Sequence, residues 1–123
     1  MNYIFSMSTD KIVCYLYTSF DQKEKLIDFI KHYKKYRSGL SHKLLICFKL
    51  LNSEEIIKIR KYLKNIKYTE FIDPNKTNDW DFGSYKRVAK YFYDKDILFL
   101  NSHSYPICNN WLKKLFFYKN KKT

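Results

Sequence analysis

Hydrophobic and polar residues follow each other in a pattern that predicts four strand–helix pairs. Short apolar runs, rich in β-branched and aromatic residues, predict strands at 12–18, 43–49, 69–73 and 96–100. After each run, apolar residues recur three and four positions apart with polar residues between them, which is the spacing of an amphipathic helix. Because strands alternate with helices, the sequence predicts an α/β fold with a mostly parallel sheet between helices.

Polar residues mark the expected ends of the first two helices. The pairs Asp21–Glu24 and Asn52–Glu55 have the spacing of a capping box, in which two side chains satisfy free backbone N–H groups at a helix start. Gly39 is expected to end the first helix, because glycine readily adopts the left-handed conformation found there.

The length and composition indicate one folded domain. The 123 residues suffice for a single core, and a hydrophobic fraction of 46% argues against disorder. We expect the core to span residues 12–116 and a basic tail to occupy residues 117–123. There is no internal repeat.

The net charge of +12 would attract nucleic acid, an anionic membrane face or a nucleotide diphosphate. Lysines are nevertheless spread along the chain, which is more typical of a solvated basic surface than of a binding patch. The three cysteines have no paired spacing, and an odd number of them suits a reducing compartment.

The start of the chain has no basic segment followed by a long apolar one, and no stretch reaches the ~20 apolar residues of a membrane span. We therefore expect a cytoplasmic protein. Peripheral contact with the anionic inner membrane remains an alternative that fits the positive charge.

Two common nucleotide-binding motifs are missing from the sequence. The segment after the first predicted strand contains neither GxGxxG nor GxxxxGK[ST], and Gly39 and Gly83 are isolated. A dinucleotide-dependent enzyme and a P-loop nucleotidase therefore lose most of their support.

Candidate binding residues follow the predicted strands, where ligands bind in parallel α/β sheets. Asn101, Ser102 and His103 come directly after the fourth strand and offer several hydrogen-bonding groups. Asp81 stands at the expected start of the third helix, and Gly83 would let another group approach the backbone closely. The structural alternatives are that Asp81 only caps the helix and that the Asn/Ser-rich turn only satisfies its own backbone.

Three stretches resemble a branch of bacterial GT-A glycosyltransferases related to family 2 and common in polysaccharide and lipopolysaccharide synthesis. They are residues 29–49, with the "SGLSH" turn and a strand ending in "FK"; 81–85, "DFGSY"; and 99–106, "FLNSHSYP", followed by "WLKKL". The resemblance implies a Rossmann-like, nucleotide-diphospho-sugar-transferase type of fold with three α/β/α layers. It covers only the N-terminal, donor-binding half, so we expect a truncated domain.

The resemblance also implies a donor site for a nucleotide sugar. The residues that it places there are Tyr17, Thr18, Ser19, Asp81, Gly83, Asn101, Ser102 and His103. Asn101 and His103 stand where such enzymes usually carry an Asp-x-Asp metal motif for Mg²⁺ or Mn²⁺. Since both acids are missing here, we expect weaker metal affinity or phosphate neutralisation by nearby lysines.

The resemblance assigns no catalytic residue in this chain. Related enzymes continue beyond the fourth helix with an acceptor site and, where the reaction inverts, a general base. We therefore expect binding of a nucleotide sugar, with transfer to a glycan or lipid-glycan acceptor only if a further segment or a second chain completes the domain.

Two other functions compete with this interpretation. A non-catalytic fragment or interaction module would use an uncovered sheet edge to pair with another chain. A basic nucleic-acid-binding domain would stack bases on exposed Tyr and Phe. The second is disfavoured, and no specific nucleic acid is expected as a partner, because the basic residues follow helix faces and form no motif.

Overall fold

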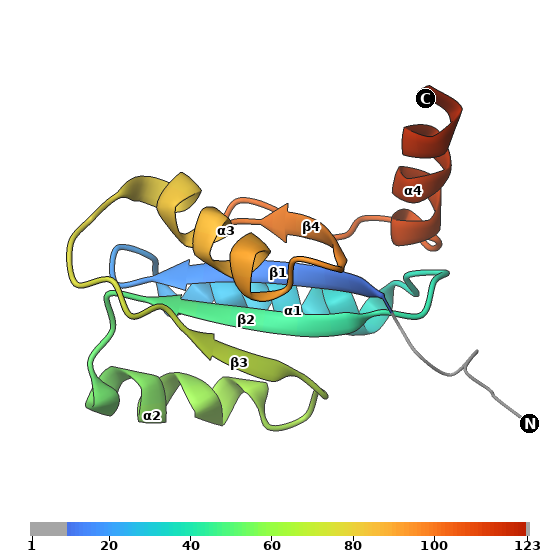
Figure 1. The fold of residues 1–123 in the computed structure, drawn as a ribbon. Helices are drawn as coiled ribbons and strands as arrows, with labels where there is room; N and C mark the ends of the chain where they lie inside the picture. Colours follow the sequence, from blue (N-terminus) through green and yellow to red (C-terminus); the bar gives the residue numbers. More distant parts are fainter. Residues whose placement is uncertain (1–9, 123) are drawn as a thin grey trace, which may run out of the picture.

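The computed structural model of this chain describes residues 10–122 and contains four strands and four helices in strict alternation (Figure 1). The elements are β1 (Lys11–Thr18), α1 (Lys23–Lys35), β2 (Lys43–Lys49), α2 (Ser53–Leu63), β3 (Thr69–Ile72), α3 (Trp80–Tyr91), β4 (Asp96–Leu100) and α4 (Trp111–Lys122). The strands form one sheet in the order β3-β2-β1-β4, and every pair is parallel. The predicted α/β fold with a parallel sheet is confirmed, and it is consistent with a Rossmann-like fold.

The strand order creates a switch point between β1 and β4. The chain moves outward from β1 through β2 to β3 and then returns to the other side of β1 to form β4. At such a point the two connections diverge, and a crevice opens beyond the carboxyl ends of the central strands. Those ends are Thr18, which pairs with Lys49 of β2, and Leu100, which pairs with Tyr15.

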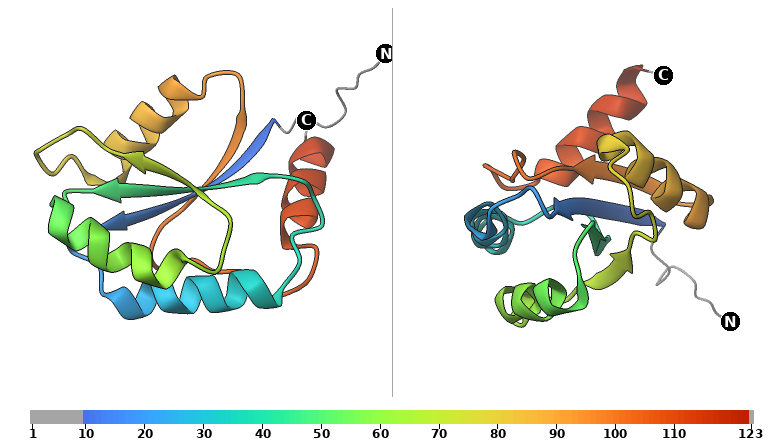
Figure 2. Two further views of the ribbon diagram at one scale, coloured as in Figure 1. Left: turned by 90° about the horizontal axis from the view of Figure 1, so that it is seen from below. Right: turned by 90° about the vertical axis from the view of Figure 1, so that its left-hand side faces the viewer.

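Helices cover both faces of the sheet and produce three layers (Figure 2). On one face, α1 and α2 bury Phe29 and Ile59 in a core that includes Tyr15 of β1. The ring centres of Tyr15 and Phe29 lie 4.1 Å apart. On the other face, α3 buries Val88 against Cys14 and Cys47. Since β1 and β2 are buried on both faces, they are continuous apolar runs without a polar face.

The fourth helix is anchored by its first turn. Trp111 and Leu112 are buried in the core that α1 and α2 form. The backbone N–H groups of Leu112 and Lys113 both donate to the Ser38 carbonyl, at 3.0 Å each, which satisfies two free donors at the start of α4. The helix continues to Lys122, so residues 117–122, which we expected to form a tail, belong to α4. Residue 123 lies outside the described part.

None of these helices combines the length and the apolar character that crossing a bilayer requires. The stretch in which the sequence has no basic segment followed by a long apolar one falls mostly on residues 1–9, outside the described range.

One of the two predicted capping boxes is confirmed. The Asn52 side chain accepts from the Glu55 N–H at 2.8 Å, and the Glu55 carboxylate accepts from the Asn52 N–H at 2.9 Å. The Asp21–Glu24 box is wrong, because α1 begins after Gln22 without a side-chain cap. The Asp21 carboxylate instead accepts from the Thr18 N–H at 2.8 Å and closes the turn that follows β1.

Two other helix ends differ from their prediction. The first helix ends at Lys35 and not at Gly39, which has a φ of 82° in the following loop. The third helix has Asp79 at its N-cap position, so Asp81 lies inside the first turn and does not cap the helix. The sequence pattern predicted the helical segments correctly but not the residues at which the helices begin and end.

Candidate functional site

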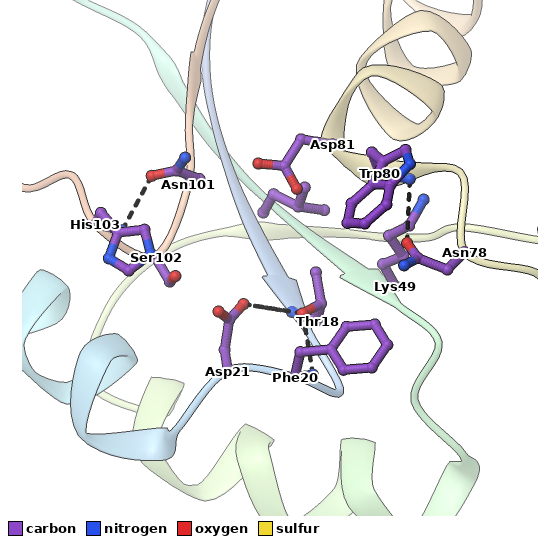
Figure 3. Close-up of a pocket in the computed structure, with 11 residues that line it drawn as sticks. Thr18, Phe20, Asp21, Lys49, Asn78, Trp80, Asp81, Asn101, Ser102 and His103 are labelled. Atoms are coloured by element: carbon purple, nitrogen blue, oxygen red, sulfur yellow. Dashed lines mark hydrogen bonds between the residues drawn. The ribbon is translucent and has the colours of Figure 1, made fainter.

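A pocket of about 420 Å³ opens at the carboxyl ends of β1, β2 and β4 (Figure 3). Its polar lining includes the carboxylates of Asp21 and Asp81 and the side chains of Asn101, Ser102 and His103. The turn after β1, the start of α3 and the turn after β4 each contribute to it. The crevice expected from the strand order is therefore present, and polar groups form part of its lining.

Two aromatic rings also line this pocket. Phe20 follows β1 and is 70% exposed, and Trp80 begins α3 and is 73% exposed. Carboxylates accept hydrogen bonds from hydroxyl and N–H groups, and aromatic faces stack on planar rings. The lining thus suits a ligand that carries several hydroxyl groups and a flat ring.

The structure brings five of the eight predicted donor-binding residues to this pocket. They are Thr18, Asp81, Asn101, Ser102 and His103. Tyr17 and Ser19 do not line it: together with Thr18 they line a neighbouring depression of about 320 Å³ beside α2. Gly83 does not line it either.

Tyr17 has a packing role in this structure. The side chain is buried in the core under α1 and α2, and its hydroxyl donates to the Asp21 carbonyl at 3.3 Å. Burial, with the negative charge of Asp21, raises the pKa of Tyr17. The strand alternation explains this placement, since Thr18 and Tyr17 point to opposite faces of the sheet.

The turn after β4 is closed by its own side chains. The Asn101 side-chain oxygen accepts from the His103 N–H at 3.0 Å and from the Ser104 hydroxyl at 3.4 Å. This is the self-satisfied turn that the structural alternative predicted. It leaves the His103 ring exposed at the pocket.

Asn101 and His103 do not fit a divalent ion as they stand, because the Asn101 oxygen already serves the turn. Over the described range, no three His, Cys, Asp or Glu side chains are grouped as a metal site requires. A role for Mg²⁺ or Mn²⁺ stays a prediction from the resemblance.

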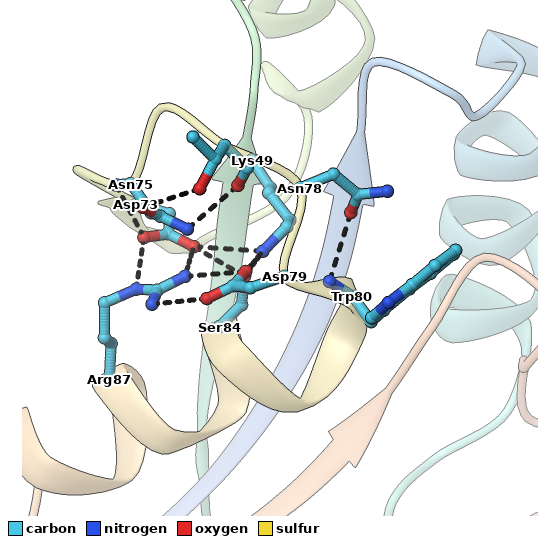
Figure 4. Close-up of polar contacts among 9 residues, drawn as sticks. Lys49, Asp73, Asn75, Asn78, Asp79, Trp80, Ser84 and Arg87 are labelled. Carbon is cyan, nitrogen blue, oxygen red and sulfur yellow. Dashed lines mark hydrogen bonds and ion pairs between the residues drawn. The ribbon is translucent and has the colours of Figure 1, made fainter.

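A partly buried cluster of charged side chains lies next to the pocket, which shares Lys49 with it (Figure 4). We call it the ion-pair cluster; its members are Lys49, Asp73, Asp79, Ser84 and Arg87. The Arg87 guanidinium binds both Asp73 oxygens, at 2.6 and 2.7 Å, and Asp79 at 2.8 Å. The Lys49 ammonium contacts Asp79 and donates to the Ser84 hydroxyl at 2.8 Å. Two cations thus balance two carboxylates.

Hydrogen bonds keep both carboxylates of the cluster ionised. Burial alone would raise the pKa of Asp73, but the hydrogen bonds from Arg87 and Ser84 outweigh it and the pKa falls. Hydrogen bonds from Arg87 and Lys49 hold the pKa of Asp79 far below its usual range. Lys49 lines the pocket, yet its charge is already matched inside the cluster.

The ion-pair cluster was not predicted from the sequence. Lys49 and Asp73 end two predicted strands, and Arg87 lies three residues after Ser84 on the face of α3 that buries Val88. These three charged residues stand where the pattern of each strand or helix predicts a buried side chain, and this could have indicated a buried ion pair. Their pairing needs the parallel register, which brings the carboxyl ends of β2 and β3 together.

Gly83 makes room for the ion-pair cluster. A Cβ atom at position 83 would overlap the Asp79 carboxylate. The prediction that Gly83 permits a close approach is therefore confirmed, with Asp79 as the group that approaches.

Replacing Gly83 by alanine should destabilise the protein. Helix propensity alone favours alanine over glycine by up to about 1 kcal/mol inside a helix. Here the new methyl group would displace Asp79 from Arg87 and Lys49, so we expect the opposite sign. Urea unfolding measures it, with Lys86→Ala on the exposed side of the same helix as control. A Gly83→Ala protein more stable than the wild type would show that the Asp79 position is not constrained.

Comparisons of this chain with protein-family models, with curated proteins and with solved structures found no match.

Proposed function

We propose that this chain binds a nucleotide sugar in the pocket beyond β1 and β4, as the donor-binding half of a glycosyltransferase domain of the GT-A type. The observation that carries the proposal is the convergence of Asp81 with Asn101, Ser102 and His103 on one pocket at the switch point of a parallel sheet. These residues come from two of the three stretches that resemble the family.

The pocket chemistry supports a nucleoside more directly than a diphosphate. Asp21 and Asp81 supply negative charge and acceptors, which match ribose hydroxyls and base N–H groups. The Lys49 charge is engaged by Asp79 and Asp73. The diphosphate would therefore lie towards His103 and the solvent, with its charge balanced by a cation bound together with the ligand or by the basic surface.

Glycosyl transfer needs more than this pocket. The bond between the sugar and the diphosphate must break while an acceptor hydroxyl attacks, and positive charge must stabilise the leaving diphosphate. We propose that an acceptor-binding segment or a second chain supplies the acceptor site, and that this chain holds the donor.

Calorimetry with UDP- and GDP-sugars, each with and without Mg²⁺ or Mn²⁺, tests the proposal. We expect binding of one nucleotide class. Asp81→Ala should weaken it by roughly ten- to hundredfold, since hydrogen bonds to a charged group contribute about 1.5–3 kcal/mol. The exposed acid Asp94 gives the charge-matched control, Asp94→Ala.

The direction of the Asp81 effect is informative by itself. If the diphosphate lay against Asp81, removing the carboxylate would relieve repulsion and tighten binding. Folded protein that binds none of these nucleotide sugars would refute the proposed function.

A further inference from the structure

The backbone at Trp80 adopts a conformation that a tryptophan rarely takes. Its φ is 62°, in the left-handed region, where side chains with a Cβ are strained. The Asn78 side chain accepts from the Trp80 N–H at 3.1 Å and so stabilises this turn. Strain of this kind persists where the surroundings enforce it, and it is common at ligand sites.

The strained turn presents a large ring to solvent at the pocket. Trp80 is 73% exposed and lines the pocket at the start of α3 (Figure 3). The strain in its backbone opposes folding, and the exposed indole buries little apolar surface that could offset it. A bound planar group that covers the ring would supply such burial.

The ion-pair cluster anchors the residue directly before Trp80. Arg87 binds the Asp79 carboxylate at 2.8 Å and Lys49 contacts it from the other side, while Asp73 holds Arg87 through two further bonds (Figure 4). Arg87 comes from the body of α3 and Lys49 from β2, so the turn is fastened to two rigid elements. The backbone from which the Trp80 side chain projects is therefore held in place beside the pocket.

We propose that Trp80 is the stacking surface for the nucleobase and that Arg87 is the positioning residue that fixes it through Asp79. This inference rests on the proposed function, because it names the part of the nucleotide that the ring contacts. Phe20, 70% exposed on the turn after β1, lines the same pocket.

Binding of UDP and GDP to Trp80→Ala, measured by calorimetry, tests the stacking. Stacking of one base on an aromatic ring corresponds to roughly a five- to hundredfold change in affinity. We expect Trp80→Ala to lose at least about tenfold and Trp80→Phe to retain most of the affinity. Phe82→Ala is the matched control, because Phe82 is 77% exposed on the same turn of α3 and does not line the pocket.

A ligand without a base separates stacking from a general loss of the site. Ribose 5-phosphate should bind wild type and Trp80→Ala equally. If Trp80→Ala binds UDP and GDP as tightly as the wild type does, the stacking role is wrong while the proposed function stands. If the wild type binds no nucleotide, both are wrong.

The positioning role has its own readout in Trp80 fluorescence. In a Trp111→Phe background, Trp80 is the remaining tryptophan. Arg87→Lys keeps the charge but loses the paired bonds to Asp73 and Asp79. We expect a shifted emission maximum and severalfold weaker UDP or GDP binding in a variant that still melts cooperatively. Unchanged emission and affinity would overturn the role of Arg87.

Discussion

Replacing Asp73 by alanine is expected to destabilise the fold by about 3–5 kcal/mol, the usual effect of removing one partner from a buried ion pair. Its side chain is fully buried and accepts from Arg87 through both oxygens and from the Ser84 hydroxyl. Without it, Lys49 and Arg87 share only Asp79, so one positive charge is not balanced, next to the Lys49 ammonium, which is 1% exposed. The loss therefore includes the desolvation of that charge as well as the missing bonds.

Urea unfolding of wild type and Asp73→Ala measures this effect. Glu70→Ala is the control, since Glu70 also binds an arginine through two bonds, at 2.7 and 2.8 Å, but near the surface. Exposed pairs contribute about 1 kcal/mol or less, so the control should lose little. Equal losses in the two variants would contradict a special role for the ion-pair cluster.

Replacing Phe29 by alanine is expected to remove about 3–5 kcal/mol of stability, as for other fully buried phenylalanines. Phe29 is 0% exposed and lies between α1 and the sheet, stacked on Tyr15 and next to Tyr33 at 5.7 Å between ring centres. The substitution would leave a cavity in the core between the sheet and helices α1 and α2. The surrounding side chains are closely packed and could not move in to fill it.

The matched control for Phe29 lies on the second helix. Ile57 is 56% exposed, so Ile57→Ala should change stability by less than about 0.5 kcal/mol. The free energy of unfolding from urea or thermal denaturation gives both values. A Phe29→Ala protein within about 1 kcal/mol of the wild type would mean that α1 does not pack as described.

The sequence predicted the element order and the sheet because the signal there is local and periodic. The run at 12–18 is apolar on both faces, and the structure buries it on both faces. No local pattern predicts that β4 lies beside β1. This position nevertheless brings Asp81 and Asn101 into the lining of the same pocket. The convergence of strand ends was predictable only from the general rule for parallel α/β sheets.

The details of the site depend on contacts between distant segments. Asp21 was expected to cap α1 but binds Thr18, and Asp81 was expected to cap α3, whose N-cap position is taken by Asp79. The choice between neighbouring aspartates is set by Arg87 and Lys49, which come from elsewhere in the fold. Local spacing carries no information about such partners.

The most direct test of the nucleotide pocket is an NMR titration of the isotope-labelled chain with UDP and GDP, followed through backbone amide shifts. We expect the largest changes at Thr18, at 80–81 and at 101–103, the pocket beyond β1 and β4. Changes centred instead on the depression around Gly39 and Asn110, at the opposite end of the strands, would contradict it. So would a spectrum that neither nucleotide alters.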